Sequence, residues 1–118
     1  TQGDVRKLQL AKAAIYAGIG VLKDHLGVRD SQISQVLLAG AFGNYIRRES
    51  AKAIGLIPDV SLDKIKSVGN AAGTGAKMVL LSKIIQMEGE SLAKSIEYIE
   101  LATSLRFQER FVDAMYFP

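Results

Sequence analysis

Apolar residues recur every three, four or seven positions through the first part of the chain, which predicts a helix over residues 3–26. Thr1 and Asp4 fit a capping box at the start of this helix, since each side chain can bond to a free amide of the first turn. Gly27 follows the last apolar position and suits a left-handed C-cap. The predicted helix therefore has a defined start and a defined end.

The apolar positions of this helix lie on two faces, so we expect it to be buried on most of its sides. One face holds a stripe and the other a second apolar set: Val5, Leu8, Ile15, Ile19, Leu22 and Leu26, then Leu10, Ala14, Ala17 and Val21. Gly18 and Gly20 weaken a helix by up to about 1 kcal/mol each relative to Ala. We expect them to allow close packing of the helix against a sheet.

Two strand–glycine–helix units follow. Residues 33–39 end in a continuously apolar run, which is typical of a strand covered on both faces. The segment GAFG (40–43) interrupts this run, and a helix is expected over 44–54 with Gly55 and Leu56 as its C-cap pair. The order then repeats with a short strand over 65–68.

Gly69 ends this second strand, and Asn70 is placed to cap a helix that extends to about residue 87. Beyond it we expect a short helix over 90–94 and an edge strand over 96–101. Thr103 or Ser104 can cap a final helix that bears the neighbouring rings of Phe107 and Phe111. The predicted fold class is α/β, rich in helices, with a few parallel strands and helices packed on them.

The amino-acid composition excludes several classes of site and of function. The chain has 118 residues, 48% of them hydrophobic and 23% charged, which suits a single domain over 1–118. It has no Cys and one His, which excludes disulfides and cysteine-ligated clusters and makes a metal site improbable. A net charge of +3 and no Trp give little sign of nucleic-acid binding. The uncharged run 13–22 is too short to span a bilayer, so we expect a cytoplasmic protein without membrane contact.

The glycines give the strongest functional signal. Five of the 11 glycines fall at the two predicted strand–helix junctions: Gly40, Gly43, Gly69, Gly73 and Gly75. Ligands of open parallel sheets bind at the carboxyl ends of strands, where the following helices present free amides to anions. Glycine lets a nucleotide approach the backbone closely. From the residues alone, nucleotide binding and purely structural turns remain about equally supported.

The order of elements resembles the second half of the superfamily of acetate and sugar kinases, heat-shock chaperones and actin. More closely, several segments resemble the corrinoid activation/regeneration proteins, which are ATP-dependent reductive activators. These segments are TQGDVRKLQLAKAAI (1–15), VLLAGAFGNYIRRESAKAIGLIP (36–58), VGNAAGTGA (68–76), IEYIELAT (96–103) and residues 107–118. The resemblance implies an actin/ribonuclease-H-like ATPase domain, of which this chain is the C-terminal portion.

The resemblance also implies a function. Such activators use ATP to drive an electron onto inactive cob(II)amide, which restores the cob(I)amide of a corrinoid methyl-transfer protein. ATP with Mg²⁺ and an iron–sulfur cluster are the implied cofactors of the parent protein. The phosphate-binding and cluster-bearing domains are expected upstream of Thr1, so the chain alone is expected to lack catalytic activity. A corrinoid protein is the implied partner, and a homodimer is a further expectation.

The resemblance assigns nucleotide contacts, and no catalytic or metal residue, to this chain. Gly40, Ala41, Phe42 and Gly43 match the adenosine motif, and Arg47 is the candidate to stack on adenine. A solvated helix face is the alternative for Arg47. The second connecting motif is matched by Gly69, Asn70 and Gly73.

Two alternative functions stay open. One is a packing or dimerisation module whose glycines serve the fold alone. The other is a half-domain of a sugar or acid kinase of the same superfamily, with phosphoryl transfer in place of redox chemistry.

Overall fold

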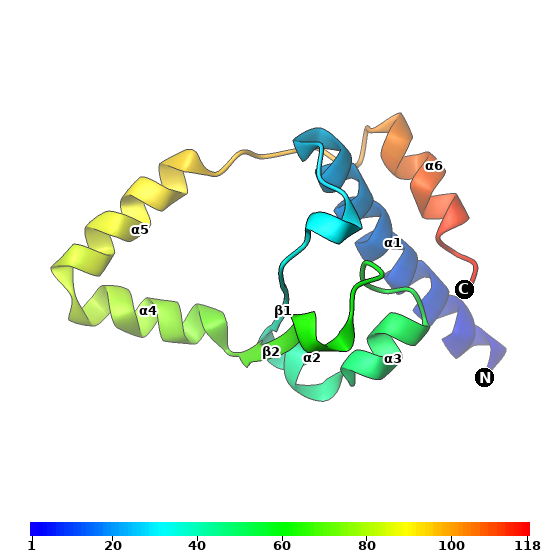
Figure 1. Cartoon of the computed structure of the whole chain (residues 1–118), viewed down its shortest axis with the longest axis horizontal. Coiled ribbons are helices and arrows are strands. Elements are labelled where there is room, and N and C mark those ends of the chain that lie inside the picture. Colours follow the sequence, from blue (N-terminus) through cyan, green and yellow to red (C-terminus); the bar gives the residue numbers. More distant parts are fainter. The chain divides into compact units, whose positions relative to one another are not determined.

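The computed structural model describes residues 1–118, apart from the side chain of Phe42 (Figure 1). The strands β1 and β2 pair in a two-stranded parallel sheet, and helices form most of the remainder. The predicted helix-rich α/β class is therefore confirmed. In chain order the elements are α1 (Gln2–Leu26), the 3-10 helix η1 (Asp30–Gln32), β1 (Val36–Ala39), α2 (Gly40–Tyr45), α3 (Arg48–Ala53), the 3-10 helix η2 (Leu62–Lys64), β2 (Ile65–Gly69), α4 (Ala71–Leu81), α5 (Lys83–Ser95) and α6 (Leu105–Asp113).

The chain divides into two compact units. The α1 unit comprises Thr1–Val36, Ile46–Lys66 and Ile99–Pro118. The α4–α5 unit comprises Leu37–Tyr45 and Ser67–Tyr98. The chain passes between the units four times: within β1, directly after α2, within β2, and between residues 98 and 99. No helix in the described part of the chain is long and apolar enough to cross a membrane.

Helix α1 begins and ends as the sequence predicts. The Thr1 hydroxyl accepts from the Asp4 amide while the Asp4 carboxylate bonds back to the start of the helix, which completes the capping box. Gly27 ends the helix in the left-handed conformation, with a φ of 65°. The amide of Val28 donates to the carbonyl of Lys23 and closes the last turn.

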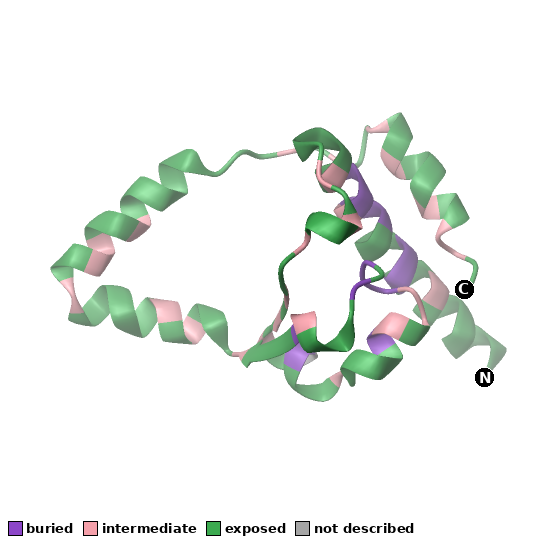
Figure 2. Cartoon of the chain, in the orientation of Figure 1, coloured by how far each residue is buried: buried purple, intermediate pink, exposed green. Residues whose placement is uncertain are grey.

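The buried face of α1 differs from the predicted one. Leu26 of the predicted stripe is 70% exposed, and most of the other predicted apolar positions are also exposed. The buried positions are mostly small: Lys12, Ala13, Ala17, Gly18, Gly20 and Val21. They lie on the purple part of α1 in Figure 2. The prediction failed because small residues let neighbours approach more closely than a leucine stripe does.

Gly18 and Gly20 face side chains rather than a sheet, which corrects the second expectation for α1. A Cβ on Gly18 would lie 3.4 Å from the Leu101 side chain, and one on Gly20 would lie 3.0 Å from the guanidinium of Arg110. Helix α6 packs along α1, and Arg110 Nη2 donates to Asp24 at 2.6 Å. The predicted Phe107–Phe111 pair is confirmed, with ring centroids 6.0 Å apart.

The largest fully buried side chain belongs to Ile65 at the start of β2. The segment after α3 also contains buried apolar residues of this unit, and it starts at the predicted Gly55–Leu56 cap. Gly55 has a φ of 68°, and the Leu56 amide donates to the Ala51 carbonyl at 3.0 Å. The buried apolar residues of the α1 unit outside α1 are Ala51, Leu56, Ile57, Val60 and Ile65.

Both predicted glycine-flanked strands form, but their limits differ from the predicted ones, and β1 is less buried than expected. Residues 33–35 lie outside β1, and Leu37 within it is 56% exposed, so the expectation of a strand covered on both faces is wrong. Only one strand pairs with β1 in the described chain, and exposed and half-buried positions alternate along it. Strand β2 follows the predicted 65–68 and includes Gly69.

Helix boundaries in the middle of the chain also differ. The segment predicted as one helix over 44–54 forms parts of two short helices, because GAFG itself begins α2 and Arg47 stands extended before α3. The helix predicted from Asn70 to about residue 87 breaks at Ser82, whose hydroxyl accepts from the Ile85 amide at 3.3 Å and caps α5.

Two further predictions from the last third of the chain are wrong. Residues 90–94 are the end of α5 rather than a separate helix, and 96–101 form no strand. A run of apolar residues with interspersed acidic ones cannot form a strand of a sheet without a neighbour to pair with. Ser104 caps α6 as expected, since its hydroxyl accepts from the Phe107 amide at 3.3 Å.

Candidate functional site

Two left-handed glycines stand at the carboxyl ends of the paired strands. Gly40 follows β1 with a φ of 73°, and Gly69 closes β2 with a φ of 63°. Because the strands are parallel neighbours, both glycines lie at the same edge of the sheet. Other residues adopt this backbone conformation only with strain, so each turn specifically favours glycine. We call Gly40–Gly43 and Gly69–Gly73 together the glycine edge.

Polar side chains join the two turns of the glycine edge. The Ser67 hydroxyl, on β2, donates to the Gly43 carbonyl at 2.6 Å. Asn44 Oδ1 lies 3.8 Å from the position that a Cβ on Gly69 would take. Neither residue was predicted from the sequence to be part of a site. Their only local signal is polarity, directly after GAFG for Asn44 and within an apolar strand for Ser67.

Asn70 caps α4 as predicted. Its side-chain oxygen accepts from the Gly73 amide at 2.9 Å, and the Thr74 amide donates to the Asn70 carbonyl at 3.0 Å. The first-turn amides of Ala71 and Ala72 have no carbonyl to bond within the helix. They are therefore the donors that this helix start offers to an anion.

Loss of this cap has a defined cost. We expect Asn70→Ala to lower the free energy of unfolding by about 1 kcal/mol, because the Gly73 amide loses its acceptor. Asn70→Asp keeps a cap oxygen and should remain close to the starting stability. Urea denaturation followed by circular dichroism measures both, and equal midpoints for the Ala and Asp variants would contradict the role of the cap.

Packing accounts for some of the glycines at this edge. A Cβ on Gly43 would lie 2.2 Å from the carbonyl oxygen of Leu38, and one on Gly73 would lie 2.5 Å from Asn70 Nδ2. Among the described atoms, nothing lies within 4 Å of a Cβ built on Gly40 or Gly75. Gly43 and Gly73 thus have structural reasons to be glycine. Gly40 combines open space with its left-handed turn.

The predicted nucleotide contacts divide between the two units. Gly40, Ala41, Gly43, Gly69, Asn70 and Gly73 all belong to the α4–α5 unit. Ala41 is exposed within α2, and the side chain of Phe42 lies outside what the structure describes. Arg47 belongs to the α1 unit, so it is not grouped with the other predicted contacts.

Arg47 is the residue before α3, and its side chain is 80% exposed. Its Nε lies 4.0 Å from a carboxylate oxygen of Glu49, while Arg48 Nε lies 3.2 Å from the other oxygen. A backbone hydrogen bond within Glu49 and the bond from Arg48 lower the pKa of the Glu49 carboxyl. This arrangement favours the solvated helix face as the role of Arg47, and stacking on adenine stays a prediction.

The glycine edge offers backbone groups to a ligand, but its side chains do not suit acid–base chemistry. Among the described residues, the polar side chains in the glycine edge or joined to it are those of Asn44, Ser67 and Asn70, none of which titrates near neutral pH. Among the described residues no group of three His, Asp or Glu side chains could hold a metal ion. Backbone amides and bare backbone are the groups that this edge offers to a ligand.

Comparison with known proteins decides the family. The profile described as the C-terminal domain of RACo, the ASKHA domain, matches residues 1–118. The chain belongs to this family. As an ASKHA C-terminal domain it shares its fold with a solved reductive activator for corrinoid, iron–sulfur protein, at a TM-score of 0.91 and 36% identity over 100% of this chain. The family resemblance seen in the sequence is thereby confirmed.

A curated relative agrees with this assignment. The chain is 44% identical over 112 residues to the corrinoid activation enzyme RamQ of Eubacterium limosum, which is 95% of this chain. The match covers 19% of RamQ, and the structural match covers 19% of the solved activator. The chain thus spans about one-fifth of the length of the relatives that it matches.

Proposed function

We propose that this ASKHA C-terminal domain is the adenine-nucleotide-binding part of an ATP-dependent reductive activator. The activator restores cob(I)amide from cob(II)amide in a corrinoid methyl-transfer protein by delivering one electron. ATP with Mg²⁺ binds in the full-length activator, and an iron–sulfur cluster outside this chain carries the electron. The chain itself has no Cys to hold such a cluster.

The observation that carries the proposal is the pairing of Gly40 and Gly69 at one edge of the sheet. Both have positive φ, and no atom that the structure describes lies within 4 Å of a Cβ on Gly40. A purine and its ribose can approach such bare backbone more closely than a backbone that carries side chains. The Ala71 and Ala72 amides supply partial positive charge beside it. The names of the two relatives support the corrinoid part of the proposal.

The glycine edge fits adenosine binding rather than hydrolysis. Its non-titrating side chains can orient a base and a ribose, while proton transfer and contacts to Mg²⁺ fall to the rest of the full-length activator. A nucleotide can change the reducibility of a docked corrinoid only by binding two conformations of the activator with different affinities. We assign this chain the part of that difference that comes from contacts to adenosine. The corrinoid protein is the partner, the compartment is the cytoplasm, and a homodimer is the proposed assembly.

A matched pair of glycine variants tests the proposal. Gly40 and Gly27 both have positive φ, at 73° and 65°, and no atom lies within 4 Å of the place that a Cβ would take on either residue. An Ala at either site strains the backbone by roughly 1 kcal/mol. In the full-length activator we expect Gly40→Ala to weaken MgATP binding at least about tenfold, and Gly27→Ala to leave it unchanged. Isothermal titration calorimetry measures both affinities.

The packing-module alternative has its own support, since packing explains Gly43 and Gly73. It expects equal loss of stability in Gly40→Ala and Gly27→Ala and no difference in nucleotide affinity between them. That result would reject the nucleotide role of the glycine edge. A tenfold difference between the two variants would reject the packing module as the whole function of this edge.

A further inference from the structure

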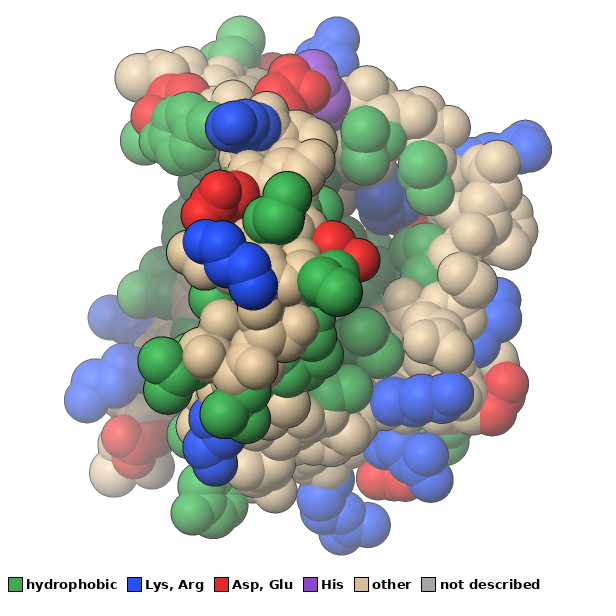
Figure 3. All heavy atoms as spheres, turned by 90° about the vertical axis from the view of Figure 1, so that its left-hand side faces the viewer, with side chains coloured by type: hydrophobic (Ala, Val, Ile, Leu, Met, Phe, Trp, Pro, Cys, Tyr) green, Lys and Arg blue, Asp and Glu red, His purple; other side chains and the backbone are tan. Residues whose placement is uncertain are grey.

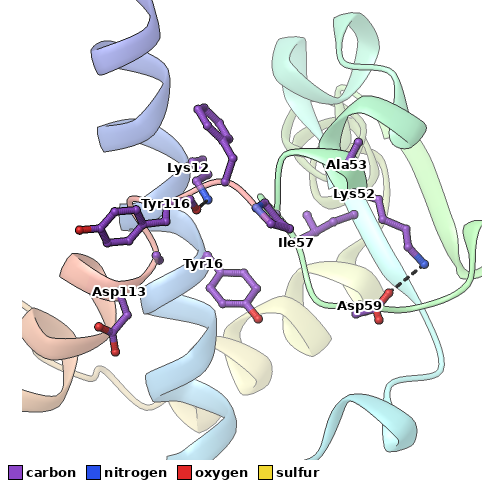
Figure 4. A pocket seen from close by; sticks show the side chains of 12 residues that line it. Lys12, Tyr16, Lys52, Ala53, Ile57, Asp59, Asp113 and Tyr116 are labelled. Atoms are coloured by element: carbon purple, nitrogen blue, oxygen red, sulfur yellow. Dashed lines mark hydrogen bonds and ion pairs between the residues drawn. The ribbon is translucent and has the colours of Figure 1, made fainter.

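A cavity of about 630 Å³ lies within the α1 unit and shares no lining residue with the glycine edge (Figure 4). Lys12 and Tyr16 of α1 line it on one side, and Lys52 with Ile57 lines it on another. The tail after α6 completes the wall through Ala114 and residues 116–118. The cavity is large enough for a small organic molecule.

Lys12 is a buried cation that faces neutral groups. The residue is 2% exposed, and its ammonium donates to the Tyr116 carbonyl and lies 5.1 Å from the centre of the Phe117 ring. In the described chain no carboxylate lies within ion-pair distance of Lys12 Nζ. Burial lowers the pKa of this ammonium. A buried charge that lacks an opposite charge is costly, which makes the Lys12 position unusual.

The other lining charges differ from Lys12. Lys52 Nζ lies 2.9 Å from Asp59 Oδ1 and donates to the Val60 carbonyl at 2.7 Å, so the charge of this ammonium is already paired with a carboxylate. Figure 4 shows this pair on the far side of the cavity from Asp113. Asp113, at the end of α6, is exposed and adds a negative charge to the lining.

We propose that this cavity binds a small organic anion, either a phosphate monoester or a carboxylic acid, with a flat apolar body. Its anionic group lies against the Lys12 ammonium, which has three donors and uses one on Tyr116. Its body packs on the Tyr16 ring and on the apolar wall formed by Ile57 and the tail. The anion supplies the counter-charge that the described residues do not provide. This inference does not rest on the proposed nucleotide site.

The test uses the 118-residue chain and four probes. Phenyl phosphate and benzoate carry the ring and a charge, benzyl alcohol carries the ring alone, and inorganic phosphate carries the charge alone. We expect one of the two aromatic anions to bind at least about tenfold more tightly than benzyl alcohol and inorganic phosphate. Which of the two binds identifies the anionic group. Calorimetry and ligand-detected NMR give the affinities.

Variants locate the binding. Lys12→Met should weaken binding of the aromatic anion at least tenfold, whereas Lys77→Met, which removes an exposed lysine of α4, should not change it. Asp113→Asn removes a negative charge from the lining and should strengthen binding at least twofold. This exposed substitution leaves the core intact, so it tests the site even if Lys12→Met does not fold.

Several results would overturn the proposal. These are no binding of either aromatic anion, equal binding of benzyl alcohol, equal loss in Lys12→Met and Lys77→Met, or an unchanged affinity in Asp113→Asn. Complete displacement of the probe by saturating MgATP in the full-length activator would also overturn it, because the cavity would then be part of the nucleotide site.

Discussion

Gly43→Ala is expected to lower the free energy of unfolding by about 3 kcal/mol, a large effect for one methyl group. The new Cβ would lie 2.2 Å from the carbonyl oxygen of Leu38 and 2.5 Å from its carbonyl carbon. These are backbone atoms of β1, so relief requires movement of the strand or of α2. Such movement also disturbs the 2.6 Å hydrogen bond from Ser67 to the Gly43 carbonyl. Urea denaturation followed by circular dichroism measures the loss.

Gly75→Ala is the matched control within the same unit. No atom lies within 4 Å of a Cβ on Gly75, and the residue lies inside α4. Ala is the better helix former, so we expect this variant to gain up to about 1 kcal/mol. If Gly43→Ala proved as stable as Gly75→Ala, the close packing of α2 against β1 would be refuted.

Ile65→Ala is expected to lower the free energy of unfolding by about 3 kcal/mol as well, through a different cause. Ile65 is 1% exposed at the start of β2, and its unit also buries Leu56 and Ile57. Truncation removes buried apolar surface and leaves a cavity that the surrounding residues fill only in part. The same urea titration measures this loss.

Ile84→Ala provides the comparison, since Ile84 of α5 is 72% exposed. Apolar side chains are exposed along α4 and α5, whose apex faces the viewer in Figure 3. We expect a change within about 0.5 kcal/mol for this variant. Equal losses for Ile65→Ala and Ile84→Ala would show that the core does not lie where the structure places it.

Local signals in the sequence predicted four helix ends correctly. Thr1, Gly27, Asn70 and Ser104 all act as the caps that their residue types favour. Capping depends on hydrogen bonds within three or four residues, so neighbouring sequence is sufficient to predict it. The same holds for the Phe107–Phe111 pair, which lies on one helix.

Features that depend on distant contacts were not predictable in this way. Contacts with α6 and the C-terminal tail determine which face of α1 is buried, so the apolar stripe predicted the wrong face. Residues 96–101 were predicted to form an edge strand, but no strand pairs with them in the described chain. The break at Ser82 requires the extended φ and ψ of −140° and 118°, which apolar periodicity does not reveal.

The candidate site was predicted in part for the same reason. Glycines that follow a strand can be read from the sequence, and Gly40 and Gly69 occupy the expected turns. The contact from Ser67 to Gly43 joins residues 24 positions apart, so local sequence gives no sign of it. The buried charge of Lys12 likewise depends on Tyr116, 104 positions away.

The most direct test of the nucleotide proposal is hydrogen–deuterium exchange of the full-length activator with and without MgATP. We expect slower exchange in peptides that cover residues 38–45 and 67–74, because bound adenosine shields the two turns and the start of α4. Peptides from α5 should not change. Protection confined to other parts of residues 1–118, with both turns unchanged, would contradict the account.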